Sequence, residues 1–138
     1  MEIMLDMVAY GQERVRARAI RSSNGKIFAS VYKSGSQRVK DEELGLRLSS
    51  YVRRFSGLVS VEICITKAIA KSVSKARRAD MVGRWCGFKP DIDNVMKWIL
   101  DVMTSVGFWE DDKVVVKLVG SKVWGETDGI LIKVEEIE

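Results

Sequence analysis

Residues 95–106 read Val-Met-Lys-Trp-Ile-Leu-Asp-Val-Met-Thr-Ser-Val, and after a short loop residues 113–123 read Lys-Val-Val-Val-Lys-Leu-Val-Gly-Ser-Lys-Val. The first stretch carries Val95, Ile99 and Val102 at helical spacing, whereas the second contains a strand-sized apolar run. Gly107 suits the left-handed cap that ends many helices. These residues therefore predict a helix that turns back into a strand.

The rest of the chain continues this mixture of strands and helices. We expect strands over 3–9, 59–66 and 130–137, and a hairpin over 15–32 that turns at Asn24-Gly25, a strong hairpin signal. We expect a helix over 41–54 and a short basic helix, capped by Ser72 or Ser74, that runs to about Val82. The pattern predicts an α+β fold, a mixed β-sheet with two or three helices packed on it. With 138 residues, one proline and no linker-like tract, the chain is expected to form a single compact domain over 1–138.

Histidine is absent, which excludes Ser-His-Asp triads and zinc sites that rely on imidazole. Cys64 and Cys86 are the only cysteines and make no disulfide framework. Every long apolar run is broken by charge, and the first residues lack the basic region of a secretory signal. We therefore expect a cytoplasmic protein without a membrane partner.

Basic residues gather in two regions, which is typical of a protein that binds a polyanion. Alternation puts Arg14, Arg16 and Arg18 on one face of the expected hairpin, and a solvated face and a phosphate-contacting face are equally compatible with this. The second region, between residues 67 and 84, contains Lys67, Lys71, Lys75, Arg77 and Arg78.

The segment Lys89-Pro90-Asp91-Ile92-Asp93-Asn94 is the richest in chemical groups. One aspartate there would be an ordinary helix N-cap, but two aspartates and an asparagine exceed what capping requires. In an extended entry segment Asp91 and Asp93 would point the same way and reach one cation. Lys97 follows one helical turn later, where it forms either a surface ion pair with Asp93 or a contact to a phosphate.

A second acidic group, Glu110-Asp111-Asp112, follows the expected helix. A tight return of the chain would let Asp112 face Asp91 and Asp93, whereas three acids in a loop are also compatible with simple solvation. Clustered carboxylates without histidine favour magnesium or manganese over zinc.

Several segments resemble the RusA-like crossover junction endodeoxyribonucleases, a family common in phages and prophages. Lys89-Pro90-Asp91-Ile92-Asp93-Asn94 with Lys97 resembles the family motif KPDxDNxxK, and residues 109–114 resemble its WxDDxxV segment. Residues 71–78 are similar to the Ser/Lys-rich stretch before the motif, and residues 12–18 to the basic N-terminal segment. Many members carry a proline in that N-terminal segment, where this chain has alanines and a valine.

The resemblance implies a homodimeric nuclease that binds four-way DNA junctions and uses Mg²⁺, with Mn²⁺ as a substitute. It implies that Asp91, Asp93 and Asp112 are the essential carboxylates, that Asp111 is a neighbouring metal-binding acid, and that Lys97 is the essential lysine. It also implies an aromatic or basic residue that helps to open the junction, for which Phe88 is the nearest candidate, and Lys89 lies beside it.

The expected reaction is hydrolysis of a phosphodiester by a metal-activated water, with Lys97 stabilising the developing charge and two protomers making paired, symmetric nicks. Two other functions remain open. One is a non-catalytic protein that binds branched DNA, and the other is a metal-dependent phosphohydrolase that acts on small substrates.

Overall fold

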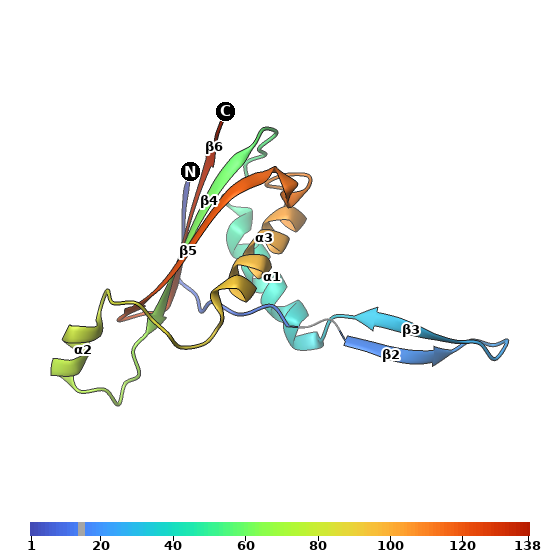
Figure 1. The fold of residues 1–138 in the computed structure, drawn as a ribbon, viewed down its shortest axis with the longest axis horizontal. Helices are drawn as coiled ribbons and strands as arrows, with labels where there is room; N and C mark the ends of the chain where they lie inside the picture. Colours follow the sequence, from blue (N-terminus) through green and yellow to red (C-terminus); the bar gives the residue numbers. More distant parts are fainter. Residues whose placement is uncertain (14–15) are drawn as a thin grey trace.

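The centre of the molecule is a four-stranded sheet with the strand order β1-β6-β4-β5 (Figure 1). The strands are β1 (Glu2–Leu5), β4 (Val59–Ala68), β5 (Val115–Gly125) and β6 (Gly129–Glu136), in a computed structural model that describes residues 1–13 and 16–138. β4 pairs antiparallel with β6 and parallel with β5. The expected mixed sheet is therefore confirmed.

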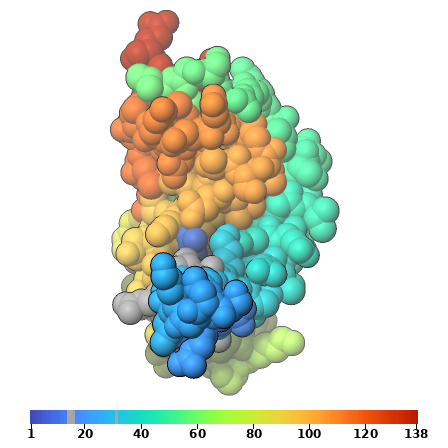
Figure 2. Space-filling model, turned by 90° about the vertical axis from the view of Figure 1, so that its right-hand side faces the viewer, coloured from blue at the N-terminus to red at the C-terminus, as the bar shows by residue number. Residues whose placement is uncertain are grey.

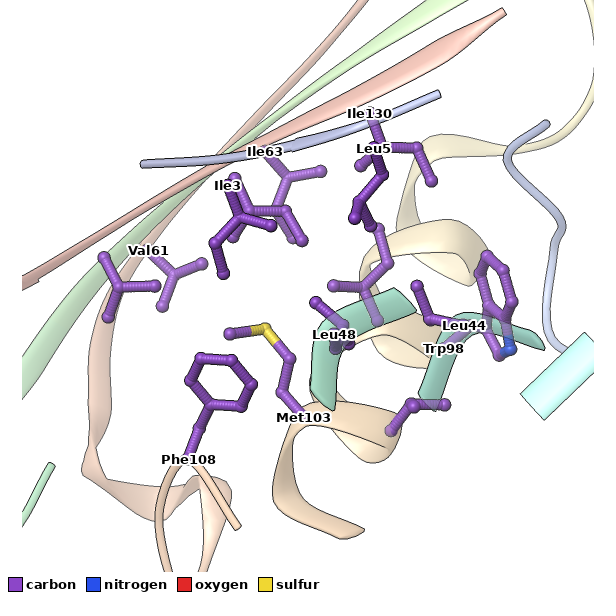
Figure 3. Close-up of a cluster of buried hydrophobic side chains, with 14 of the residues drawn as sticks. Ile3, Leu5, Leu44, Leu48, Val61, Ile63, Trp98, Met103, Phe108 and Ile130 are labelled. Atoms are coloured by element: carbon purple, nitrogen blue, oxygen red, sulfur yellow. The ribbon is translucent and has the colours of Figure 1, made fainter. Parts of the chain in front are cut away.

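Helices α1 (Gly35–Ser49) and α3 (Ile92–Val106) enclose the hydrophobic core against one face of this sheet (Figure 3). Alternate residues of β4 are fully buried, as a strand with one covered face requires. Trp98 of α3 is 1% exposed, and its Nε1 donates to Asp41 Oδ1 of α1 at 2.9 Å. The core side chains that Figure 3 labels are Ile3, Leu5, Leu44, Leu48, Val61, Ile63, Trp98, Met103, Phe108 and Ile130.

Helix α3 joins the core to the motif region. It begins at Ile92, three residues before the expected start, because Asp91 takes the extended N-cap conformation (φ −66°, ψ 134°). It ends at Gly107, whose φ of 103° confirms the expected left-handed cap. The next two residues, Phe108 and Trp109, are buried and anchor the chain directly after the turn.

The boundaries of α1 were predicted wrongly at both ends. The helix begins six residues early because Ser34 caps it, its side chain accepting a hydrogen bond from the Gln37 backbone. It ends at Ser49, so Tyr51 and Phe55 reach the core from the following segment and not from a longer helix. Their helical spacing in the sequence is coincidental.

Three other elements differ from the expectation in length or place. β1 stops at Leu5, and a 3₁₀ turn, η1 (Asp112–Val114), delays the start of β5 to Val115. The short helix α2 (Lys75–Met81) is capped by Ser74, as one of the two expected alternatives, but it buries no side chain and stands away from the core. No helix within the described residues is long and apolar enough to cross a membrane.

The expected hairpin is confirmed as a separate two-stranded sheet of β2 (Arg16–Arg21) and β3 (Ile27–Tyr32), which we call the hairpin arm. Gly25 in its turn has a φ of 83°, a conformation that glycine adopts without strain. The arm projects from the body of the molecule in Figure 1 and points at the viewer in Figure 2. None of its described side chains is buried. A lone two-stranded hairpin is at best marginally stable in water, so the arm suits a surface that gains contacts from a ligand or partner.

Gly107→Ala should lower the free energy of unfolding by about 1–2 kcal/mol, the usual strain of a side chain in the left-handed region. Gly57→Ala is the matched control, because that glycine has no positive φ and an added Cβ meets no atom within 4 Å. Urea denaturation of both variants measures the difference. Equal stabilities would show that the turn after α3 tolerates a side chain.

Candidate active site

The N-terminal end of α3 presents two carboxylates that the fold leaves free. Asp91 is the N-cap residue, yet its side chain makes no capping hydrogen bond. Asp93 lies in the first helical turn, and both side chains are exposed. The positive end of the helix dipole favours negative groups at this place. Because the Asp91 side chain caps no backbone group, however, capping does not account for its presence.

The expectation that Asp91 and Asp93 share an extended segment is wrong. The helix begins between them, and residues two apart around a helix do not face each other. A common metal ion would have to lie beyond the helix end, where both side chains can turn toward it. The assignment of the two residues as ligands stays a prediction.

Lys97 lies one turn after Asp93 and is exposed. The surface ion pair between them is not formed: among the described residues, no ion pair within 4.0 Å includes either side chain. Asp101, one turn further, continues the same face of α3. Asp93, Lys97 and Asp101 thus form a polar stripe along the helix, and Asp101 is a residue that the sequence analysis missed although its spacing indicated it.

Asp112 lies at the other end of this stripe, where η1 begins. It shares a shallow hollow with Lys33, Asp101, Thr104, Glu110 and Asp111. Partial burial and the negative charges of Asp111 and Asp101 raise the pKa of Asp112. Asp111 caps η1, since its Oδ1 accepts a hydrogen bond from the Lys113 backbone at 2.9 Å. One oxygen of Asp111 therefore has a structural role.

The two acidic groups do not meet within one chain. Asp112 shares its hollow with Thr104, which lies about 16 Å along the helix axis from Asp93 at the usual rise per residue. In the part of the chain that the structure describes, no three acidic or cysteine side chains are arranged to hold a metal ion. The expectation that Asp112 faces Asp91 and Asp93 is thus wrong for a single protomer, because the hollow of Asp112 reaches α3 at Asp101 and Thr104, about two or more helical turns beyond Asp93.

The donor set at Asp91 and Asp93 nevertheless fits Mg²⁺. Magnesium dehydrates reluctantly and is commonly held by only one or two protein carboxylates together with waters and substrate phosphates. Two exposed carboxylates without ion-pair partners in the described chain meet that requirement. No third protein ligand is needed for a metal that arrives with its substrate.

The segment that leads into α3 is tied to strand β5. Lys122 Nζ donates to the backbone oxygens of Phe88 at 2.5 Å and Pro90 at 2.7 Å. The Phe88 ring packs edge-on against Trp124, with ring centroids 5.5 Å apart. Lys122 is a second residue that sequence reasoning missed, because nothing in the sequence connects it with a loop 32 positions away.

The predicted DNA contacts fall on two exposed surfaces. On the hairpin arm, Arg18 is exposed with its guanidinium 5.5 Å from the centre of the Tyr32 ring. Arg16 lies in β2, and Arg14 falls outside the described residues. The other surface, which we call the α2 surface, contains Lys67, Lys71, Lys75 and Arg77.

Three predicted contacts beside the α2 surface differ in character. Arg78 is engaged in holding the fold, donating to the backbone oxygens of Ile69 and Ala70 and pairing with Glu126 at 3.4 Å. Phe88 remains 65% exposed despite its contact with Trp124, and Lys89 is exposed. Phe88 and Lys89 are thus accessible to a ligand, whereas the Arg78 side chain is already bonded to other parts of the protein.

Trp85 precedes these residues and is 78% exposed, so its ring does not anchor the loop in the core. Its backbone forms an isolated bridge with Val123 of β5. The indole ring is accessible next to Arg84, which pairs with Asp80 at 3.1 Å. An exposed aromatic ring is therefore available beside the α2 surface.

The start of α3 lies between the two elements that carry the basic surfaces. In the view of Figure 1, α2 is on the left, the hairpin arm is on the right, and α3 begins between them. η1 and Asp112 follow the far end of α3.

Comparison with known proteins agrees with this picture. A family model described as "Endodeoxyribonuclease RusA" matches residues 9–135. A protein of Lactococcus phage r1t named "Crossover junction endodeoxyribonuclease rusA" is 37% identical over 54 residues, which are 39% of this chain and 41% of that protein. The matched stretch spans less than half of the relative's length. Because the family model covers nearly the whole chain, the chain belongs to the RusA family of endodeoxyribonucleases.

Proposed function

We propose that this protein is a Mg²⁺-dependent endodeoxyribonuclease that resolves four-way DNA junctions by paired nicks. The observation that carries the proposal is the position of Asp91, Asp93 and Lys97, exposed and without ion-pair partners in the described chain, between two basic surfaces. The family membership and the phage relative's name support the same activity.

The charges suit a phosphodiester backbone better than a small phosphoester. Residues 16–33 contain five lysines and arginines and no acid, and none of their described side chains is buried. The α2 surface adds four exposed or half-exposed cations on the other side of α3. A small substrate needs only one local anion site, whereas two separated basic surfaces match a duplex or a branched DNA that spans both.

Asp91, Asp93 and Lys97 then each have a task. Asp91 and Asp93 would hold the cation at the start of α3. Lys97, one turn along α3, donates to a phosphate of the DNA and offsets the negative charge that develops there. Bound Mg²⁺, or Mn²⁺ in its place, supplies Lewis-acid activation of the phosphodiester and of a water.

Asp112 enters this proposal separately, since it does not reach the first pair in one chain. Its carboxylate is held beside two other acids, an arrangement that costs stability and therefore indicates a use for the charge. Paired nicks require two sites related by symmetry, which a homodimer supplies. In such a dimer the surface around Asp112 is available to the DNA or to the second protomer.

Asp93→Asn should lower Mg²⁺-dependent nicking of a synthetic four-way junction by about 100-fold or more, because a lost ligand removes several kcal/mol of charge stabilisation. Binding of the junction in EDTA should be unchanged or tighter. Asp6→Asn, which changes an exposed aspartate that belongs to neither acidic group, is the matched control and should nick normally. Nicking by Asp93→Asn at the normal rate would refute the assignment, and binding without nicking by the unaltered protein would favour a non-catalytic DNA-binding function.

Lys71→Ala together with Lys75→Ala should weaken junction binding and reduce the slope of log affinity against log salt by about two, one for each lost phosphate contact. Both lysines are exposed on the α2 surface. Lys117→Ala, an exposed lysine of β5 outside both basic surfaces, is the control. Filter binding or fluorescence anisotropy between 50 and 300 mM salt (roughly the range in which phosphate contacts dominate) measures the slope. An unchanged slope would show that the α2 surface does not contact the DNA.

Asp112→Asn should raise the free energy of unfolding at pH 7 while it lowers nicking. The raised pKa means that the folded chain holds this proton more readily than the unfolded chain, so wild-type stability falls as the pH rises above the ordinary value of 3.8. The gain of the variant should therefore be present at neutral pH and disappear below 3.8, where the carboxyl is protonated in both states. Urea denaturation at pH 7 and below pH 3.8 measures the difference in the free energy of unfolding between the variant and wild type. A variant less stable than wild type at pH 7 would contradict it.

A further inference from the structure

We propose that Lys122 is a positioning residue that holds the backbone in front of α3 and so sets the direction in which Asp91 points. Its Nζ donates to the carbonyl oxygens of Phe88 and Pro90, the latter belonging to the residue directly before Asp91. The catalytic consequence of this role rests on the function proposed above, whereas its effect on the backbone does not.

A lysine is well suited to this contact. An ammonium has three donors and no acceptor, so one group can bind two carbonyl oxygens at once. Hydrogen bonds from a charged donor are about twice as strong as neutral ones. With the carbonyl oxygens of Phe88 and Pro90 bound to the same atom, neither the Phe88–Lys89 peptide nor the Pro90–Asp91 peptide can rotate without breaking a bond. The conformation of Asp91 is thereby fixed without any contact to its carboxylate, which stays free.

Strand β5 is a rigid base for this lysine. The Lys122 backbone oxygen accepts a hydrogen bond from Cys86 at 3.0 Å, and Lys122 pairs with Ile65 of the central strand β4. Two residues before it, on the same side of the strand, an added Cβ at Gly120 would lie 2.3 Å from Met96 Sδ of α3. The first two turns of α3 therefore lie directly on β5 at the point where Lys122 reaches the loop.

The alternative that Lys122 contacts a DNA phosphate itself is less compatible with its surroundings. The side chain is partly buried, and two of its three donors are directed at the protein backbone. Lys117, on the same strand, is exposed, and no hydrogen bond or ion pair of its side chain occurs within the described chain. The strand thus offers a matched lysine that lacks the proposed role.

The test compares Lys122→Met, which keeps the length of the side chain but donates no hydrogen bond, with Lys122→Arg and with Lys117→Met. We expect Lys122→Met to raise the Mn²⁺ concentration for half-maximal nicking about tenfold, the usual effect of removing a group that orients a metal ligand. Junction affinity in EDTA and its salt dependence should stay at the wild-type value. Lys122→Arg should restore most of the metal affinity, and Lys117→Met should behave as wild type.

Two measurements on the protein without DNA accompany the nicking assay. Hydrogen exchange should become faster in peptides that cover residues 86–94 of Lys122→Met, and Mn²⁺ binding followed by electron paramagnetic resonance should weaken by a similar factor. If Lys122 only stabilised the fold, Lys122→Met would lower the free energy of unfolding without changing the metal dependence. Lys122→Arg keeps the comparison valid even if Lys122→Met folds poorly.

The outcomes separate the two proposals. Unchanged exchange and unchanged metal dependence in Lys122→Met would overturn the positioning role, as would a loss of junction affinity at normal metal dependence, which would make Lys122 a DNA contact. If wild type nicks no junction, the proposed function fails, yet faster exchange confined to residues 86–94 would still support the positioning role and normal exchange would still refute it.

Discussion

The packing of α3 onto the sheet is the contact on which the rest of the structure depends. Its apolar face, with Val95, Ile99 and Met103 fully buried, lies against the strands, and Gly120 lets it approach β5 closely. The opposite, polar stripe is thereby turned outward. Because β4 and β5 run parallel, the chain between them must cross the sheet, and α3 completes that crossing. One helix thus closes the core and carries the candidate chemistry.

Because α3 both closes the core and carries the candidate chemistry, the backbone at its two ends is held in different ways. At the N-terminal end the carboxylates are free, and order is imposed on the backbone from β5 through Lys122. At the C-terminal end Gly107 turns the chain, and the buried rings of Phe108 and Trp109 fix the segment that leads to Asp112. In both places rigid neighbours hold the backbone, and the carboxylates remain accessible to a ligand.

The sequence alone predicted the elements whose local signals agree with their packing. Asn24-Gly25, Ser74 and Gly107 act within a few residues of themselves, so the hairpin turn, the cap of α2 and the end of α3 were predicted correctly. α1 was misplaced because Ser34 and Gly35 begin the helix before its apolar residues, and because Tyr51 continues the apparent periodicity beyond its end. Local polar capping, not the hydrophobic pattern, decided where α1 begins.

The candidate site shows a different limit. Sequence spacing identified Asp91, Asp93 and Lys97, but it could not show that Asp91 and Asp93 lie on either side of a helix start, nor that the length of α3 separates them from Asp112. Both facts depend on where the helix begins. The role of Lys122 could not be predicted from the sequence for another reason, because its partners are backbone carbonyl groups, which every residue has. Residues that act on the backbone leave no pattern of side chains, so a three-dimensional structure is required to find them.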